Sequence, residues 1–205
     1  MNKIAVVTGG SGGIGRCTAA SLKAAGCTVY EISRRDIPSD GIIHMSADVT
    51  DEAQVRRVID EIAAREGRID ILVNNAGFGI SGAAELTESR DSHAQLELNV
   101  FGTDNVTRAV LPHMRAQGGG RIVCMSSIAG IVPIPFQLWY SVSKAAIIAY
   151  VLALQNEVRP FGISVCAIMP GDIASGFTDA RRKSAAGDDV YAGRIERSVA
   201  VMEHD

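Results

Sequence analysis

Short apolar runs alternate with longer amphipathic stretches along most of this chain. The runs are bounded by glycine or polar residues, which is typical of strands buried on both faces of a parallel sheet. They occupy residues 3–8, 28–32, 42–46, 69–73, 121–127 and 163–169. Most of the stretches between them repeat apolar residues every three or four positions, the spacing of a helix. The pattern predicts an α/β fold, a doubly wound parallel sheet with helices on both faces.

The first two helices have recognisable ends. One should stop near Gly26, and the next should be capped by Thr50, with acidic residues in its first turn. The buried stripe of this second helix would be Val55, Val58, Ile59 and Ile62. Residues 36–41 are too few for a normal crossover between the second and third strands, so no helix is expected there.

Two further helices are predicted later in the chain. One runs from about Ser89 to Met114. Its apolar side would be Leu96, Val100, Val106 and Val110. The other, residues 145–154, is apolar on nearly every side, so one side should face the sheet and the other a second subunit. We therefore expect a homodimer or homotetramer with Ile147, Val151 and Leu154 in its interface, which could also include the helix around Asn99.

Composition narrows the functional classes. The 205 residues, 47% hydrophobic and 21% charged, fit a single globular domain. The net charge of −3 and the scattered basic residues argue against nucleic-acid binding. No signal peptide is expected, and the run at 145–154 is too short to span a bilayer. The cysteines sit in apolar segments without Cys-x-x-Cys spacing, and the histidines lack ligand spacing. These features predict buried thiols, no metal site and a cytoplasmic location.

A glycine-rich turn follows the first strand, Gly9-Gly10-Ser11-Gly12-Gly13-Ile14-Gly15, and leads into a helix. A strand, a glycine turn and a helix in this order are the context of a dinucleotide-binding fingerprint. Glycine lets the backbone approach a pyrophosphate closely, and the helix N-terminus offers N–H groups and a favourable dipole. A glycine turn that binds nothing is the alternative.

The residues after the second strand bear on cofactor choice. A carboxylate about 20 residues past the glycines normally holds the ribose 2′-OH of NAD, whereas an arginine accommodates the 2′-phosphate of NADP. This chain has Ser33 and Arg34 there, and Arg16 could add a second cation. Two solvated loop arginines are the alternative. We expect NADP(H) in preference to NAD(H). Asp48 would either cap a turn or accept a hydrogen bond from adenine.

Tyr140 and Lys144 are four residues apart and would share one helix face. A free phenol has a pKa near 10, and a nearby ammonium would lower that pKa toward the range useful for proton transfer. Ser127, at the end of a strand, could hold a substrate oxygen on which charge develops. An aromatic core residue with a solvated lysine is the alternative.

Taken together, the motifs resemble the short-chain dehydrogenase/reductase family over about residues 3–178. The resemblance depends on their joint order and spacing, since any one of them is weak. The motifs are Thr8 to Gly15, Asp48, Asn74-Asn75-Ala76-Gly77, Asn99, Ser127, Tyr140-x-x-x-Lys144 and Pro170-Gly171-Asp172-Ile173. The resemblance implies a Rossmann-type fold in one domain, residues 1–205.

The resemblance also implies roles for individual residues. Tyr140 would be the general acid/base, Ser127 would orient the carbonyl or hydroxyl, and Lys144 would lower the pKa of Tyr140 and hold the nicotinamide ribose. Asn99 would anchor a water in a proton relay to Lys144; a solvated Asn is the alternative. The cofactor-binding residues would be Gly9, Ser11, Gly13, Ile14, Gly15, Ser33, Arg34, Asp48, Val49, Asn75, Ala76, Gly77, Tyr140, Lys144, Pro170, Gly171, Ile173 and Ser175.

The function expected from this resemblance is hydride transfer between NADP(H) and a carbonyl or secondary alcohol. A lipophilic small molecule such as a steroid, retinoid or aryl ketone is expected, because apolar residues would line the mouth of the site. These are Phe78, Ile131, Pro133, Ile134, Phe136, Trp139 and Phe177. Loop packing is the alternative for them. The rival functions are a non-catalytic NADP(H)-binding regulator and an inactive, C-terminally incomplete member of the family.

The last part of the chain departs from the family pattern. It ends soon after the run at 163–169, whereas family members continue to a seventh strand. Residues 1–175 would form the nucleotide-binding and catalytic core, and 176 to about 190 a mobile flap over the substrate site. Val190, Ile195 and Val199 lie near helical spacing and predict one short helix after the flap. The sheet would end at the sixth strand with an exposed edge.

Overall fold

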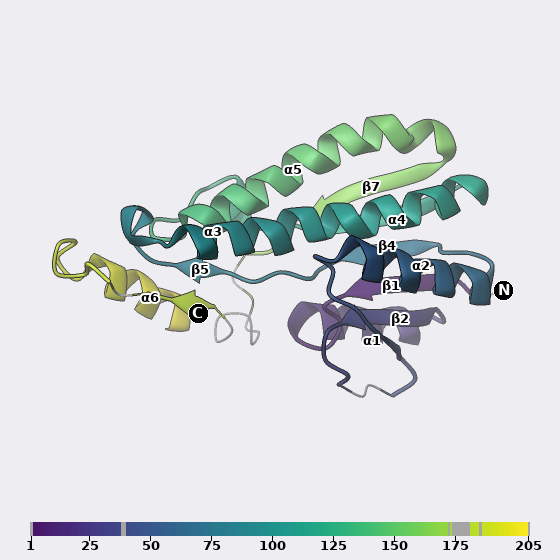
Figure 1. Ribbon diagram of the computed structural model, residues 1–205, viewed down its shortest axis with the longest axis horizontal. Helices are drawn as coiled ribbons and strands as arrows, with labels where there is room; N and C mark the ends of the chain where they lie inside the picture. The colour runs from purple at the N-terminus through teal and green to yellow at the C-terminus, as the bar shows by residue number, and fades with distance from the viewer. Residues whose placement is uncertain (1, 38–39, 172, 174–180, 185, 205) are drawn as a thin grey trace.

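The computed structural model describes residues 2–37, 40–171, 173, 181–184 and 186–204, and its arrangement is shown in Figure 1. The main sheet has six parallel strands in the order β3-β2-β1-β4-β6-β7. They are β1 (Ile4–Thr8), β2 (Thr28–Ser33), β3 (Ile43–Ser46), β4 (Ile71–Asn74), β6 (Gly120–Met125) and β7 (Ile163–Ile168). The strand order reverses between β1 and β4, where doubly wound folds place their ligand crevice. The predicted fold class is confirmed.

Helices lie on both faces of the sheet (Figure 1). On one face, α1 (Gly13–Ala24) covers a small apolar cluster that includes Ala19 and Val29. On the other, α2 (Glu52–Glu66), α4 (Gly102–Ala116) and α5 (Leu138–Val158) contribute to the main core. The first face is open at β7, where Cys166 is exposed. Because Cys17 is exposed as well, the prediction that the thiols are buried is wrong for these two cysteines.

The start of α2 corrects the predicted cap. Asp51, not Thr50, is the cap: its carboxylate accepts hydrogen bonds from the backbone N–H groups of Ala53 and Gln54, each at 3.0 Å. A carboxylate reaches both donors, whereas the Thr50 hydroxyl turns back toward Asp48. The predicted buried stripe of α2 is confirmed. No helix occurs in the described part of the crossover between β2 and β3, as expected.

The helix predicted over residues 89–114 is interrupted at its centre. It consists of α3 (Ser89–Leu96), a π-helical turn (Glu97–Phe101) and α4. Asn99 lies in the π turn and is buried, so the alternative of a solvated Asn is wrong. π turns insert one extra residue into a helix and are common at functional sites.

The apolar helix α5 corrects the predicted interface. Ile147, Val151 and Leu154 are buried within this chain, against its own core. The outward large apolar side chains of the same helix are Leu138, Val142 and Leu152, 44%, 42% and 55% exposed. With the turn that follows, residues Leu138–Phe161 are long and apolar enough to cross a membrane by composition. The charged Lys144 inside this stretch and its packing on the sheet mark it as a core helix.

The end of the chain forms a small separate unit. β8 (Arg182–Lys183) pairs in parallel with β5 (Ile80–Ser81), outside the main sheet. α6 (Arg194–His204) follows with Ile195 fully buried, which confirms the predicted short helix. Within the described residues the main sheet ends at β7, as expected. Of the predicted flap, residues 176–180 and 185 lie outside the described residues, whereas residues 182–183 form β8 and pair with β5.

Candidate active site

The predicted motifs gather at the carboxyl edge of the sheet. β1 ends at Thr8, β4 at Asn74 and β6 at Met125, and these strands are neighbours. The residues that follow each strand therefore face a common crevice. The glycine turn, Asn75 and Ser127 all follow one of these ends.

The glycine turn is braced by the segment after β4. The Thr8 hydroxyl accepts hydrogen bonds from the backbone N–H groups of Asn75 and Ala76, each at 3.0 Å. The Asn75 amide donates to the carbonyls of Thr8 and Gly9, at 3.0 and 3.2 Å. A Cβ at Gly15 would lie 2.3 Å from the Gly9 oxygen, so only glycine fits there. Asn75, predicted to contact a cofactor, thus shapes the turn. Thr8 was included in the family motif, but its bracing role was not predicted.

The start of α1 fits an anionic group. Gly12 precedes this helix without a side-chain cap, and the first turn carries no acidic residue. The first N–H groups of an uncapped helix have no partner within the helix and attract anions such as phosphate. The five predicted residues of this turn, Gly9, Ser11, Gly13, Ile14 and Gly15, surround that helix start.

A buried carboxylate lies beside the place predicted for the adenosine end of the cofactor. Glu31 on β2 is 2% exposed, and its Oε1 contacts His44 Nδ1 and accepts a hydrogen bond from Ser33 Oγ at 3.2 Å. Its Oε2 has no hydrogen-bond partner among the described residues. Arg34 is exposed at this end and lies 3.8 Å from Asp48 Oδ2. Sequence reasoning missed Glu31, although a glutamate in an otherwise apolar strand was a visible signal.

Asp48 caps a turn, which was one of its two predicted roles. Its Oδ1 accepts hydrogen bonds from the backbone N–H and the hydroxyl of Thr50, at 3.0 and 2.8 Å. The side chain of Val49 is buried and so close to α4 that a Cβ at Gly102 would lie 2.9 Å from it. The predicted adenine contact of Asp48 stays a prediction.

Tyr140 and Ser127 meet as predicted. Ser127 begins the turn after β6, its Oγ accepting from the N–H of Ala129 at 3.1 Å, and it shares a hydrogen bond with the Tyr140 phenol. Burial raises the pKa of Tyr140 above its ordinary value, although the hydrogen bond to Ser127 and the charge of Arg181 oppose this rise. The predicted lowering of the Tyr140 pKa is therefore wrong in direction for this structure, because loss of hydration outweighs both opposing influences.

Lys144 is not the solvated lysine of the alternative. Its ammonium donates to the Met125 carbonyl at 2.8 Å and lies 5.7 Å from the centre of the Tyr140 ring. Burial lowers the pKa of Lys144 to about 8. The Ser126 hydroxyl also donates to the Lys144 carbonyl at 2.7 Å, which fixes α5 against the end of β6.

Asn99 is a bracing residue in this structure. Its amide nitrogen donates to the Phe78 carbonyl and to Ser143 Oγ, each at 3.0 Å, and its oxygen accepts from the Phe78 N–H at 3.0 Å. Ser143 in turn donates to the Tyr140 carbonyl at 2.7 Å. The segment after β4 is thereby joined to the helix that carries Tyr140. The water relay through Asn99 stays a prediction, and Ser143 was missed.

The segment after β7 completes the crevice. The Pro170 carbonyl accepts a hydrogen bond from the Ile128 N–H at 3.0 Å, and a Cβ at Gly171 would contact the Ile128 side chain at 3.0 Å. Ile173 is half exposed, and Ser175 lies outside the described residues. Among the predicted mouth residues, Ile131 and Ile134 are exposed, whereas Phe136 packs edge-on against Tyr191 and Phe177 is not described.

Arg181 lies at the site without having been predicted there. Its guanidinium carbon is 5.7 Å from the centre of the Tyr140 ring. The next residue, Arg182, pairs with Asp91 at 2.8 Å and lies over the Phe78 ring. No local pattern in the sequence marks Arg181, because pairing between β8 and β5 brings it here.

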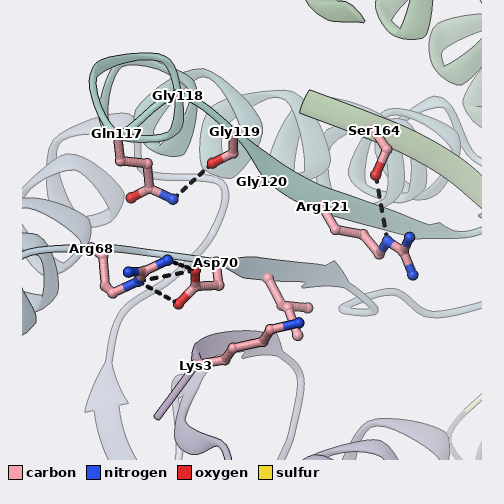
Figure 2. Close-up of a pocket in the computed structure, with 10 residues that line it drawn as sticks. Lys3, Arg68, Asp70, Gln117, Gly118, Gly119, Gly120, Arg121 and Ser164 are labelled. Carbon is pink, nitrogen blue, oxygen red and sulfur yellow. Dashed lines mark hydrogen bonds and ion pairs between the residues drawn. The ribbon is translucent and has the colours of Figure 1, made fainter. Parts of the chain in front are cut away.

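The opposite edge of the sheet carries a surface cavity of about 410 Å³, shown in Figure 2. It is lined by residues near the amino ends of the strands, including Lys3, Asp70 and Arg121. Asp70 pairs with Arg68, and Arg121 donates to Ser164 at 3.4 Å. Because this cavity faces away from Tyr140, we place the site at the carboxyl edge. No cluster of three or more His, Cys, Asp or Glu suited to a metal occurs in the part of the chain that the structure describes.

Comparisons with known proteins show which family this chain resembles. A model of the short chain dehydrogenase family matches residues 3–186. The chain is 41% identical to the 3-ketodihydrosphingosine reductase of Bacteroides thetaiotaomicron, covering 99% of this chain and 77% of that protein. It is 33% identical to the 3-oxoacyl-[acyl-carrier-protein] reductase of Thermotoga maritima, covering 86% and 76%. A short-chain dehydrogenase from Streptomyces avermitilis has a closely similar structure, with a TM-score of 0.90 and 36% identity over 99% of this chain and 78% of that one.

Proposed function

Because this chain belongs to the short-chain dehydrogenase family, an oxidoreductase family that uses nicotinamide cofactors, we propose that it is an NADP(H)-dependent reductase of lipophilic ketones. It would transfer hydride reversibly between nicotinamide and a carbonyl or secondary alcohol carbon. The observation that carries the proposal is the contact between Ser127 and Tyr140 beside Lys144, at the carboxyl edge of the sheet.

The residues of this edge have separable tasks. The glycine turn and the uncapped start of α1 would hold the pyrophosphate, and Lys144 the nicotinamide ribose. When bound, the nicotinamide supplies or accepts the hydride. Ser127 would donate a hydrogen bond to the substrate oxygen, and Tyr140 would give that oxygen a proton in reduction or take one in oxidation.

The proposed substrate is a ketone on a long alkyl chain. Two similar proteins are named for reducing a 3-keto or 3-oxo group on such chains. In this chain the turn after Ser127 exposes apolar side chains next to the site, Ile128, Ile131, Val132 and Ile134. An alkyl chain laid over these residues would remove apolar surface from water, at roughly 25 cal/mol per Å².

The preference for NADP(H) depends on Arg34. Its guanidinium is exposed at the end of β2 and suits a charge-assisted contact with a 2′-phosphate. The buried Glu31 carboxylate, which accepts a hydrogen bond from Ser33, opposes the preference for NADP(H), because a carboxylate repels a phosphate. We expect Arg34→Ala to weaken NADPH binding at least about tenfold, the scale of a lost charge-assisted bond, and to leave NADH binding unchanged. Equal wild-type affinity for NADPH and NADH, measured by calorimetry, would refute the preference.

The decisive experiment is a turnover screen. Wild-type protein is mixed with NADPH or NADH and a series of 3-keto alkyl compounds, steroid ketones and aryl ketones, and the absorbance of reduced nicotinamide is followed. Faster consumption of NADPH with the 3-keto alkyl compounds supports the proposal. Tight NADPH binding without turnover of any compound would favour the regulator instead.

A further inference from the structure

Two cations flank the ring of Tyr140. The Lys144 ammonium and the Arg181 guanidinium each lie 5.7 Å from the ring centre. The two groups come from different parts of the fold: Lys144 from the same helix as Tyr140, and Arg181 from the segment that leads into β8. A cation at this distance stabilises a phenolate relative to a neutral phenol.

The two cations differ in how permanent their charge is. Lys144 is buried, donates to the Met125 carbonyl, and has a pKa of about 8. It is therefore only partly charged in mildly alkaline solution. A guanidinium keeps its charge throughout that range. The constant positive charge beside Tyr140 is that of Arg181, and this charge is one of the influences that lower the pKa of the phenol.

Contacts of the neighbouring residues fix the backbone beside Arg181. The N–H of Arg182 donates to the Gly79 carbonyl, and the N–H of Ser184 donates to the Ser81 carbonyl, each at 3.0 Å. The Arg182 side chain adds an ion pair with Asp91 at 2.8 Å. These anchors fix the backbone immediately after Arg181 against the segment that follows β4.

We infer that Arg181 is a positioning residue whose fixed charge favours release of the Tyr140 proton, and that the pairing of β8 with β5 delivers it. The inference deepens the proposed function and rests on it for its catalytic consequence. In alcohol oxidation the hydroxyl proton would pass to the Tyr140 phenolate, and a hydride would pass from the carbon that bears this hydroxyl to the oxidised nicotinamide, which leaves a carbonyl. A charge that favours the phenolate therefore raises the share of enzyme ready to accept that proton.

The direct test measures the phenol itself. The protein is labelled with ¹³Cζ-tyrosine, and the Tyr140 resonance among the four tyrosines is assigned with Tyr140→Phe. The phenolate fraction is compared near pH 10, the ordinary phenol pKa, with circular dichroism confirming that each variant is folded. Arg181→Met, which keeps the length of the stem, is expected to lower the fraction. Arg181→Lys should retain the wild-type phenolate fraction. Lys183→Met, which removes a charge from the exposed strand β8, should also leave this fraction unchanged.

A second readout tests the consequence for turnover. The pH profile of kcat/KM for alcohol oxidation should move to higher pH in Arg181→Met, with a loss of about threefold to tenfold on the rising limb, and stay in place in Arg181→Lys. Equal phenolate fractions in wild type and Arg181→Met would overturn the inference. An Arg181→Lys variant that behaves like Arg181→Met would also overturn it, because the shape of the Arg181 side chain and not its charge would then be what matters. A shifted phenolate fraction in a protein that turns nothing over would uphold the inference and refute the proposed function.

Discussion

Tyr140 is subject to opposing influences at the scale of a single residue. Burial disfavours its phenolate, whereas the Ser127 hydrogen bond and the Arg181 charge favour it, and burial prevails. A raised pKa suits donation of the phenol proton to a carbonyl less than a value near neutrality would. The chemistry proposed here therefore depends on every positive charge that the site can add.

The first prediction concerns the transferable proton of Tyr140. Tyr140→Phe keeps the ring and removes only the hydroxyl, so turnover should fall at least ~10²-fold, the usual scale for general acid–base catalysis. NADPH affinity should stay nearly unchanged. Tyr150→Phe is a matched control on the same helix, because the Tyr150 hydroxyl donates to Asp104 instead. Steady-state kinetics with full retention of kcat in Tyr140→Phe would exclude this residue as the acid.

Lys144 gives a prediction about stability and pH. Burial lowers its pKa from 10.5 to about 8 in the folded chain, so the unfolded chain binds more protons between these pH values. The free energy of unfolding should consequently rise with pH from about 8 toward 10.5, and the full shift corresponds to about 3 kcal/mol. Lys144→Met lacks this slope. It should be more stable than wild type at pH 7, although the loss of a donor to Met125 reduces the gain.

Urea unfolding near pH 7 and near pH 9.5 checks this, with Lys3→Met as the exposed control. The advantage of Lys144→Met over wild type should shrink at the higher pH. Parallel pH dependences of wild type and Lys144→Met would contradict the buried, weakly basic lysine.

At the residue scale, the sequence predicted the site residues whose chemical role and local spacing along the chain indicate the same site. Tyr140 and Lys144 share a helix turn, and Ser127 lies two residues after the end of β6, so their meeting followed from local structure and parallel-sheet geometry. Arg181 and Glu31 were missed for different reasons. The position of Arg181 depends on pairing between segments about 100 residues apart. Glu31 could be seen as unusual, but its burial against His44 is a tertiary contact.

At the scale of elements, apolar periodicity located helices better than it assigned their faces. α5 was predicted to be buried, but the side facing the sheet could not be told from the side facing outward, because both are apolar. The π turn at Asn99 also has no periodic signature. The Thr103 hydroxyl donates to the Asn99 carbonyl at 3.0 Å, inside the helix, where the sequence predicted only a regular turn.

The cap of α2 yields a prediction at this scale. Asp51 accepts from two orphan N–H groups at the helix start and also from the Gln54 side chain at 2.8 Å. Asp51→Ala should lower the Tm by about 2–4 °C, the scale of one lost cap in a domain of this size. Thr50→Val, at the position that the sequence predicted as the cap, should lower it less. A larger loss in Thr50→Val than in Asp51→Ala, measured by calorimetry, would reverse the assignment.

At the scale of the whole molecule, the strand order separates two unlike edges. The carboxyl edge collects the glycine turn, Ser127 and Tyr140, whereas the amino edge holds the cavity of Figure 2, lined by ion-paired and backbone groups. The doubly wound parallel sheet itself was predictable from alternating strands and helices, whereas its strand order was not predicted. The exposed surfaces were not predictable from the sequence, because the exposure of a side chain depends on which tertiary neighbours cover it.

Self-association is the last prediction. The outward side of α5 replaces the buried Ile147, Val151 and Leu154 in the expected interface, and the helix around Asn99 stays part of it. Phe101 on the π turn is 54% exposed, close in exposure to Leu152 on the adjoining helix α5. Large exposed apolar side chains on two packed helices are typical of an interface. We predict a homodimer or homotetramer at micromolar concentration by light scattering, and Leu152→Glu should dissociate it with its circular dichroism unchanged. Ala20→Glu, exposed on α1 at the other face of the sheet, is the control and should leave it assembled. A monomeric wild type, or an assembly that tolerates Leu152→Glu, would show that this surface does not join subunits.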